Sequence, residues 1–463
     1  MNTNNTRRQF MKKALTASAG VAALSTMELG LMKSAFAQNS CANGEYKALV
    51  CVFLYGGNDS YNMLVPMRGD ALTDYKGMRG KLARNDALEI YPTGHNISGG
   101  IGFVPEMQSL KNLFDSGKLA IQGNVGTLVK PLVGSNGKLL EGIIPKPLTL
   151  ASHSAQASTW QRGAESNQAG IGGTGWSGRM MDSLICQQTD DHFLQSISFG
   201  GQNLWQVGAN NRPYSLDTDS IKKISMFHKD NELGKRLPII ENLLQNQKYE
   251  NILQQAYAET LKRAENNARN IETDIDDITD LTTEFPEGGL SEQFKVVTKL
   301  MRLGKSRGLK RQVFLVGIGG FDTHEEQDKR HSGLLENVSN SLASFYQSTI
   351  EMGMEENVTS FTMSEFGRNL VPNESLGTDH GWAGHQLILG GAVKGGLYGD
   401  ILTQSQETLD NLGGGLVPTT ATEEMYASLA QWFGLNRANC DDVFPNLKNF
   451  VDEGKALNIN YFA

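Results

Sequence analysis

Four short apolar runs constrain the fold of this chain most strongly. The first, Ala48 to Tyr55, is continuously apolar and is bounded by Gly56 and Gly57. A run of this kind fits a strand that is buried on both faces, as in a parallel sheet covered by helices on each side. The three other runs are Lys118 to Gln122, Arg311 to Ile318 and Val358 to Met363.

Helical segments separate these runs. Residues Pro105 to Ser116 precede the second run, and the amphipathic segment His331 to Met352 lies between the last two. Strand, helix and strand in this order predict a parallel βαβ unit. Thr420 to Phe433 predicts a further helix, with Thr420 and Glu423 spaced as a capping box. The predicted fold class is α/β, with a mostly parallel central sheet flanked by helices on both faces.

Residues 219–303 have apolar side chains at helical spacing and few glycines. This pattern predicts two or three helices packed as a cap or side layer, which we interpret as a helical insertion without catalytic residues. Apart from this insertion, residues 38–463 are predicted to form a single α/β domain.

The amino terminus has the pattern of a twin-arginine export signal. Arg7 and Arg8 precede a weakly apolar stretch, Ala14 to Met27, which is too short to span a membrane. The tripeptide AFA at 35–37 offers a cleavage site, so residues 1–37 are expected to be removed. We therefore expect the twin-arginine translocase as a partner during export, a periplasmic or secreted location, and no membrane span after cleavage.

Charge and cysteine content narrow the classes of partner. The net charge of -8 and the pI near 5.6 argue against a nucleic-acid partner, which would require a basic face. The four cysteines match neither a zinc-ribbon nor a haem-attachment spacing, and they allow three disulfide pairings. They are Cys41, Cys51, Cys186 and Cys440.

Acidic side chains and histidines follow the ends of predicted strands, where ligands bind in open α/β sheets. Asp59 follows the first strand, and Asp322 and His324 follow the strand that ends at Ile318. Residues two apart in an extended segment point the same way, so Asp322 and His324 are expected to face one site. The alternatives are a turn aspartate at position 59 that caps a helix, and a solvated loop at 322–324.

Two later motifs add further ligand types. Glu365 stands at the end of the last strand, and Arg368 is suited to hold an anionic substrate oxygen, unless the two form a surface ion pair. Asp379, His380 and His385 lie within seven glycine-studded residues, which a flexible polar loop would also explain. Carboxylate and imidazole ligands without thiolates suit Zn, Mn, Fe or a similar divalent ion.

Ser152 and His153 stand at a predicted helix start. A hydroxyl and an imidazole at this place can supply a nucleophile and a hold for an anion. The alternative is that Ser152 is the N-cap of a helix with a polar first turn.

An ordered set of motifs resembles the domain of unknown function 1501 family. The motifs are "LYGGNDSYNMLVP", "LASHSAQASTWQRG", "GGFDTH", "FTMSEFGR" and "GTDHGWAGHQLILGGAVKGG", and the resemblance runs from about residue 47 to the end. That family is similar in turn to the alkaline phosphatase and sulfatase superfamily. The resemblance implies an alkaline phosphatase-like fold, two divalent metal ions, and a Ser, Thr or modified Cys as nucleophile.

The resemblance also implies roles for individual residues. Asp59 matches the metal-binding Asp after the first strand, and Asp322 and His324 match a later Asp and His pair, which the superfamily more often spaces by four. Asp379 with His380 matches a "DHG" motif in letters.

Two of these assignments stay open. Glu365 matches the position of the motif's Asp, because "FTMSEFG" resembles the strand that leads into "SDHG" in the superfamily. The last His ligand is then either His380 or His385.

The resemblance implies hydrolysis or transfer of a phosphate or sulfate ester, with a small anionic ester as substrate. Ser152 is the expected nucleophile, Ser60 is the second choice, and metal-activated water is a third route. Arg368 and His153 are expected to position the anionic group. Two Zn, Mn or similar divalent ions are expected, with seven ligands: Asp59, Asp322, His324, Glu365, Asp379, His380 and His385.

Two other classes of function compete with this hypothesis. One is a catalytically inactive metal-binding module that serves cell-surface or polysaccharide assembly. The other is a structural scaffold whose acidic and histidine side chains only cap loops, in which case Asp59, Asp322 and His380 would lie well apart.

Overall fold

The computed structural model describes most of the chain from residue 44 onward. The described ranges are 44–92, 99–133, 146–147, 149–163, 172–184, 192–218, 277–401, 415–452 and 455–462, together with single positions and pairs between 254 and 275. The expected export signal at 1–37, Cys41, Cys186 and the first part of the expected helical insertion lie outside the described residues.

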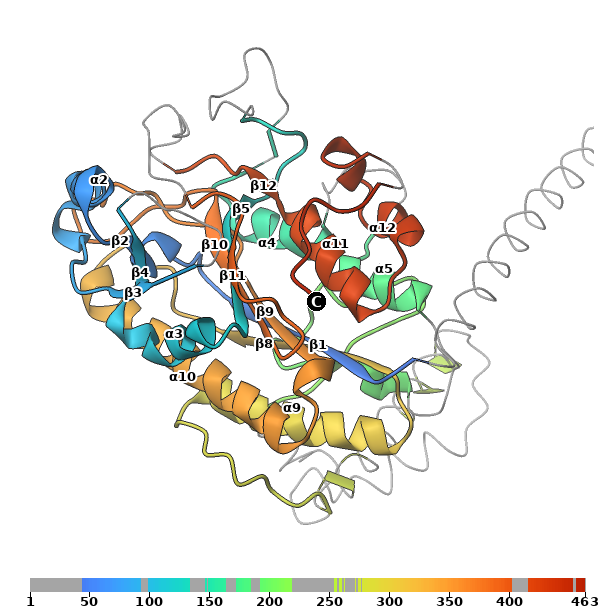
Figure 1. The fold of residues 1–463 in the computed structure, drawn as a ribbon. Helices are drawn as coiled ribbons and strands as arrows, with labels where there is room; N and C mark the ends of the chain where they lie inside the picture. Colours follow the sequence, from blue (N-terminus) through green and yellow to red (C-terminus); the bar gives the residue numbers. More distant parts are fainter. Residues whose placement is uncertain are drawn as a thin grey trace, which may run out of the picture.

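A nine-stranded sheet runs through the centre of the molecule (Figure 1). In spatial order its strands are β11 (Gly396–Tyr398), β5 (Leu119–Gly126), β10 (Gly384–Gly390), β9 (Val358–Met363), β1 (Lys47–Leu54), β8 (Arg311–Ile318), β6 (Ser196–Ser198) and β7 (Tyr214–Ser215), and β12 (Thr420–Ala421) pairs with β5. Every pairing is parallel except the two that β10 makes with β5 and β9. The predicted mostly parallel sheet is confirmed.

Strand β1 is buried on both faces. Val50 and Val52 point into one apolar core, and Leu49, Cys51 and Phe53 point into the other. This alternation explains the continuous apolar run, because neither face of the strand meets water.

Helices cover each face of the sheet (Figure 1). One core is closed by α3 (Gln108–Asp115), α9 (Gly289–Ser306) and α10 (Gln327–Glu351). The other is closed by α4 (His153–Arg162), α5 (Trp176–Ser183), α11 (Thr422–Phe433) and α12 (Arg437–Val443).

Strands β8 and β9 flank β1 and run parallel to it, joined by α10. The register places Leu54 opposite Ile318, and Phe53 opposite Met363. The three strands therefore end at the same edge of the sheet, and the loops that follow them meet there. The predicted βαβ unit is confirmed, although its helix begins at Gln327 rather than His331.

A small antiparallel sheet lies beside the main one (Figure 1). It consists of β2 (Leu64–Pro66), β4 (Ile101–Phe103) and β3 (Leu88–Ile90), and α2 (Gly69–Arg79) follows β2. The 3-10 helices are η1 (Ser60–Asn62), η2 (Gly80–Leu82), η3 (Pro105–Met107), η4 (His192–Gln195), η6 (Glu355–Asn357) and η8 (Leu447–Asn449).

The predicted capping box of α11 is wrong by one residue. Thr420 belongs to β12, and the helix begins at Thr422. The side chain that reaches back is Glu424, whose Oε2 accepts a hydrogen bond from the backbone N–H of Ala421 at 3.1 Å. Glu423 is instead buried, because pairing of Thr420 with β5 shifts the start of the helix.

Helix α9 begins within the segment 219–303 that was expected as a cap or side layer, and it ends three residues beyond it. Its Phe294, Val297 and Leu300 are fully buried in the core beneath the sheet, so this part of the segment belongs to the sheet's own helical layer. Cys51 and Cys440 are buried free thiols. No helix among the described residues combines the length and the apolar character needed to cross a membrane.

Candidate metal centre

The candidate site lies where the loops after β1, β8 and β9 meet. Gly56 follows β1 with φ of +119°, and a Cβ there would lie 2.2 Å from the backbone nitrogen of Asp322. Only glycine permits this close approach between two loops. The backbone N–H of Gly56 also donates to Glu365 Oε1 at 2.8 Å, which ties the loop after β9 to the same point.

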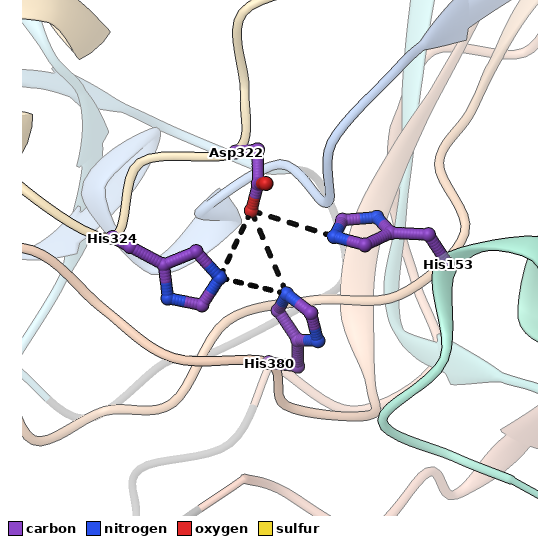
Figure 2. Close-up of side chains that lie close together, drawn as sticks. All are labelled: His153, Asp322, His324 and His380. Atoms are coloured by element: carbon purple, nitrogen blue, oxygen red, sulfur yellow. Dashed lines mark hydrogen bonds and ion pairs between the residues drawn. The ribbon is translucent and has the colours of Figure 1, made fainter.

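Four side chains converge at this edge: His153, Asp322, His324 and His380 (Figure 2). Each offers one ligand atom, and these atoms all lie within 4.8 Å of one another. The Nε2 atoms of His153, His324 and His380 lie 3.4, 3.1 and 3.5 Å from Asp322 Oδ1. The Nε2 atoms of His324 and His380 are 2.9 Å apart.

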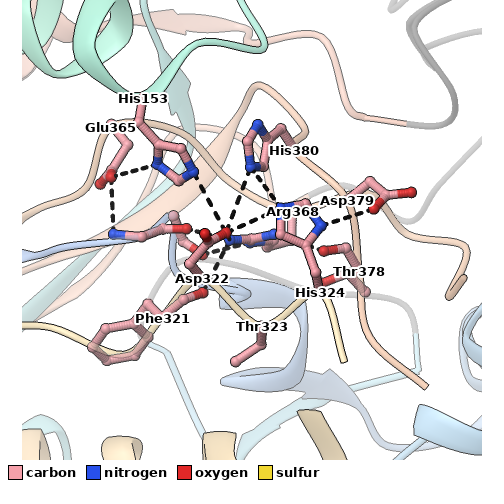
Figure 3. A network of polar contacts seen from close by, with 12 residues as sticks. His153, Phe321, Asp322, Thr323, His324, Glu365, Arg368, Thr378, Asp379 and His380 are labelled. Carbon is pink, nitrogen blue, oxygen red and sulfur yellow. Dashed lines mark hydrogen bonds and ion pairs between the residues drawn. The ribbon is translucent and has the colours of Figure 1, made fainter. Parts of the chain in front are cut away.

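The second nitrogen of each imidazole is bonded to an acceptor, and Figure 3 shows this for His153 and His324. His153 Nδ1 lies 2.9 Å from Glu365 Oε1, and His324 Nδ1 lies 2.9 Å from Asp379 Oδ1. His380 Nδ1 lies 2.8 Å from the carbonyl oxygen of Ala151. Carboxylates and carbonyls only accept, so each Nδ1 carries a proton, and any of these rings that is neutral turns an Nε2 lone pair toward the centre.

Burial and the surrounding charges favour these protonation states. Burial lowers the pKa of His380, although the hydrogen bond to the Ala151 carbonyl acts in the opposite direction. Partial burial would raise the pKa of Asp322, but the hydrogen bond and the charge of Arg368 lower it below its ordinary value. The His380 ring is therefore neutral at pH 7, and the Asp322 carboxylate is ionised.

Packing fixes the orientation of two of the rings. Phe366 is buried, and its ring centroid lies 4.9 Å from that of His153 and 4.5 Å from that of His380. A Cβ on Gly57 would lie 2.3 Å from the Phe366 ring, so a glycine at this position makes room for it. His153 is the first residue of α4, and His380 lies in the loop before β10.

The donor set fits a divalent metal ion. In a tetrahedral zinc site, metal–ligand distances of about 2.0–2.1 Å place the ligand atoms roughly 3.3 Å apart. The three distances to Asp322 Oδ1 and the distance between His324 and His380 are 2.9–3.5 Å and bracket that value, and all four ligand atoms lie within 4.8 Å of one another. Imidazole ligands whose second nitrogen is held by a carboxylate or carbonyl are typical of metal sites. Nitrogen and oxygen donors without thiolates suit Zn, Mn or Fe.

Comparison with known proteins places the chain in a family. A family model described as "Protein of unknown function (DUF1501)" matches residues 46–435. The chain belongs to the DUF1501 family. The resemblance expected from its motifs is thereby confirmed. No protein of curated function matches this DUF1501 chain in sequence.

Two solved structures resemble the DUF1501 chain distantly. One is Ps i-CgsB in complex with k-i-k-neocarrahexaose, with 10% sequence identity and a TM-score of 0.34, over 88% of this chain and 77% of that chain. The other is the PsFucS1 sulfatase from Pseudoalteromonas sp., with 10% identity and a TM-score of 0.31, over 89% and 72% of the two chains. Both TM-scores are below 0.5, so family membership rests on the sequence match.

The DUF1501 site differs from the expected seven-ligand, two-metal arrangement. Of the expected ligands, Asp322, His324 and His380 converge. Glu365 and Asp379 do not reach the centre, because each holds the Nδ1 of a converging histidine from behind. Within the described part of the chain, this is the only group of three or more His, Cys, Asp or Glu side chains close enough to share an ion.

Asp59 and His385 are also placed outside the group. Asp59 is fully buried in an ion pair with Arg79. His385 is 3% exposed, and its Nδ1 accepts from the backbone N–H of Asn124 at 3.1 Å. Burial lowers the pKa of His385 to about 4, with Asp59 acting in the opposite direction, so its ring is neutral at pH 7.

The four residues expected to act on the substrate, Arg368 among them, are placed differently from the expectation. Ser152 is the N-cap of α4, where its Oγ accepts from Ala155 N–H at 3.4 Å, as in the alternative interpretation. Ser60 Oγ is buried and accepts from the backbone N–H of His385. His153 has joined the converging group.

Arg368 is fully buried and does not face solvent. Its guanidinium donates to the carbonyls of Gly56, Gly57, Phe321 and Thr378, and to Asp322 Oδ1 at 2.5 Å. These bonds hold the three loops together, so Arg368 is positioned to organise the site and not to bind a substrate anion.

Sequence reasoning missed the place of His153 in the group. Its motif follows no predicted strand, and the usual signal of a ligand after a strand end was therefore absent. The available signal was a histidine at the first position of a predicted helix. The start of a helix can face a binding site, just as the end of a strand can.

Proposed function

We propose that this DUF1501 protein is an exported hydrolase that uses one divalent metal ion to cleave a sulfate or phosphate ester. One observation carries the proposal: the Nε2 atoms of three imidazoles lie 3.1–3.5 Å from one carboxylate oxygen, and two of those Nε2 atoms are 2.9 Å apart. Lone pairs at this distance repel unless a metal cation or an added proton lies between them, and we propose the metal cation. His153, Asp322, His324 and His380 would hold that ion.

The surroundings favour one ion over the two expected from the resemblance. Asp59, the residue that matched a ligand of that pair, is committed to Arg79. Arg368 places a fixed positive charge against the same Asp322 oxygen that the imidazoles face. A second divalent ion beside that guanidinium would meet like charge.

A bound divalent ion supplies Lewis-acid chemistry, by activating water and by neutralising charge on an ester oxygen. The chain's own residues prepare for it. Glu365 keeps a proton on His153 Nδ1, and Asp379 keeps one on His324 Nδ1, so both Nε2 atoms stay available. Asp322 is half-exposed, which leaves the centre open to a substrate from solvent.

Charge favours an anionic substrate. A divalent ion bound to three neutral imidazoles and one carboxylate is a positive centre where the substrate would meet it, with the cation of Arg368 behind Asp322 and the carboxylates of Glu365 and Asp379 farther out, behind the histidines. Water is the nucleophile in this proposal, because Ser152 and Ser60 both use their hydroxyl oxygens as backbone acceptors. The sulfate or phosphate ester class comes from the motif resemblance.

Metal analysis with a matched pair of variants tests the metal part of the proposal. We expect the purified protein, reconstituted with Zn²⁺ or Mn²⁺ and desalted, to retain about one ion per chain. His380→Gln should lose it, whereas His385→Gln, the same change five residues on, should retain it. Folded wild-type protein that retains no divalent ion would contradict the proposal.

A panel of aryl sulfate and aryl phosphate esters tests the hydrolase part. We expect turnover by the metal-loaded wild type and none by His380→Gln. Metal binding without turnover of any ester would favour the alternative of a catalytically inactive metal-binding module.

A further inference from the structure

A buried amide lies between the two loops that carry Asp322, His324 and His380, and it bonds to both. Gln327, the first residue of α10, is 1% exposed. Its Oε1 accepts from the hydroxyl of Thr323 at 3.0 Å and from the hydroxyl of Thr378 at 2.6 Å. Thr323 lies between Asp322 and His324, and Thr378 stands two residues before His380.

The orientation of this amide is set from its other side. Because Gln327 Oε1 accepts from two hydroxyls, its Nε2 must face an acceptor, and it donates to Asp59 Oδ2. Asp59 in turn pairs with Arg79, and both are fully buried. Burial alone would raise the pKa of Asp59, but Arg79 and His331 and the hydrogen bonds from Gln327 and Arg79 lower it, so the acceptor is ionised.

Arg79 connects Asp59 and Gln327 to the beginning of the loop that carries His380. Its Nη1 donates to the carbonyls of Asn369 and Leu370 at 3.0 Å each. The loop that carries His380 is therefore bonded at two places. Its beginning is bonded to Arg79, and Thr378, near its end, is bonded to Gln327. Its position relative to the loop of Asp322 and His324 is fixed at both places.

We propose that Gln327, held by the Asp59–Arg79 ion pair, is the positioning residue that sets the spacing between the Asp322/His324 loop and the His380 loop. The inference rests on the proposed metal function. In this inference Asp59 does not bind the metal ion. It accepts a hydrogen bond from the Gln327 amide and thereby holds that amide in place. The consequence for the site is metal affinity, because ligand atoms must be placed within about 0.2 Å of their ideal distances.

The loops also touch directly, so the amide's contribution must be separated from that contact. The backbone N–H of Thr378 donates to the carbonyl of Thr323 at 3.0 Å, Asn373 Nδ2 donates to the carbonyl of His324 at 2.8 Å, and Arg368 bonds to both loops. Thr323→Val and Thr378→Val leave this backbone bond in place and delete only the hydroxyls that meet Gln327.

The test is the dissociation constant for Zn²⁺, measured by competition with a chromogenic chelator. We expect Thr323→Val and Thr378→Val each to weaken Zn²⁺ binding about 10–100-fold, as is typical for residues behind metal ligands. Thr378→Ser, which keeps the hydroxyl, should stay near wild type. Thr298→Val removes another buried hydroxyl, one that donates to the Lys295 carbonyl within α9, and should leave affinity unchanged.

A double-mutant cycle then asks whether the hydroxyls act through Gln327. In a Gln327→Met background, Thr378→Val should weaken Zn²⁺ binding further by less than about threefold, since the shared acceptor is gone. If circular dichroism shows that either Thr323→Val or Thr378→Val does not fold, the other variant alone is enough for the test. Wild-type affinity in folded Thr323→Val or Thr378→Val would overturn this inference alone, whereas a wild type that binds no metal would overturn the proposed function with it.

Discussion

His324 and His380 face each other through their Nε2 atoms at 2.9 Å, while the Nδ1 of each ring is bonded to an acceptor. Neither ring can then donate to the other unless one of them takes a second proton. A cation satisfies both rings at once. The proposed metal site follows from this relationship, and the predictions below test it and its surroundings.

Removing the metal should destabilise the protein. An ion that binds only the folded state, at a free concentration of 100 times its Kd, adds about 2.7 kcal/mol to the free energy of unfolding. We expect wild-type protein treated with a chelator to melt several degrees lower, and Zn²⁺ or Mn²⁺ to restore the melting temperature. Calorimetry on His380→Gln is the control, and an equal response in that variant would place the ion elsewhere.

Asp379 should tune metal affinity without being a ligand. Its Oδ1 holds His324 Nδ1, and the same bond lowers the pKa of Asp379 below its ordinary value. We expect Asp379→Ala to weaken Zn²⁺ binding about 10–100-fold and Asp379→Asn to weaken it less, because an amide oxygen still accepts. The control is a Zn²⁺ titration of Glu374→Gln, which removes one negative charge from an exposed position in the same loop. A loss of stoichiometry instead of affinity would make Asp379 a ligand.

Replacement of Arg368 should harm assembly of the site and not substrate recognition. Lysine lacks the planar fork of donors that reaches four carbonyls, and each buried carbonyl left without a donor costs about 1–3 kcal/mol. We expect Arg368→Lys to unfold at lower urea concentration and to bind less metal. A stable, metal-loaded variant in which only KM for the anionic ester rises would instead support the expected substrate-binding role.

Glu423 should make stability fall as the pH rises toward neutrality. Burial raises the pKa of Glu423 to about 7, although Thr422 and Asn446 donate hydrogen bonds to it. The folded protein thus keeps a proton that the unfolded chain releases above its ordinary pKa, so this group's contribution is complete below about pH 4.5 and is lost as the pH rises through 7.

The neutral variant Glu423→Gln should remove that dependence. We expect it to be more stable than wild type by up to about 3 kcal/mol at pH 8 and nearly equal at pH 4. Urea denaturation at both values measures this, with Glu287→Gln as the exposed control. A difference that is the same at both pH values would contradict a buried titrating carboxyl.

Export should depend on the paired arginines. Replacing Arg7 and Arg8 with lysines keeps the charge but removes the recognised pair, and we expect the precursor to accumulate inside the cell. Immunoblots of cytoplasmic and periplasmic fractions measure this. Unchanged export of the double variant would show that another route carries the chain.

The sequence by itself determined four strands of the nine-stranded sheet. The predicted strands 311–318 and 358–363 coincide with β8 and β9, because a continuous apolar run bounded by glycine or polar residues has few other ways to be buried. It also placed Asp322 and His324 together, since both follow one strand end at a spacing that faces one site. The start of α11 was misplaced because Thr420 pairs with β5, a contact that local spacing does not record.

Only the tertiary structure decided which side chains meet. His153 comes from the start of α4 and His380 from a distant loop, and nothing in either local motif fixes the distance between them. Asp59 carries the same signal as Asp322, an acid after a buried strand, yet Arg79 pairs with it and removes it from the group. The end of a strand determines where the backbone places a residue. Which partner its charged side chain binds depends on the cost of burying that charge, and therefore on every segment that packs around it.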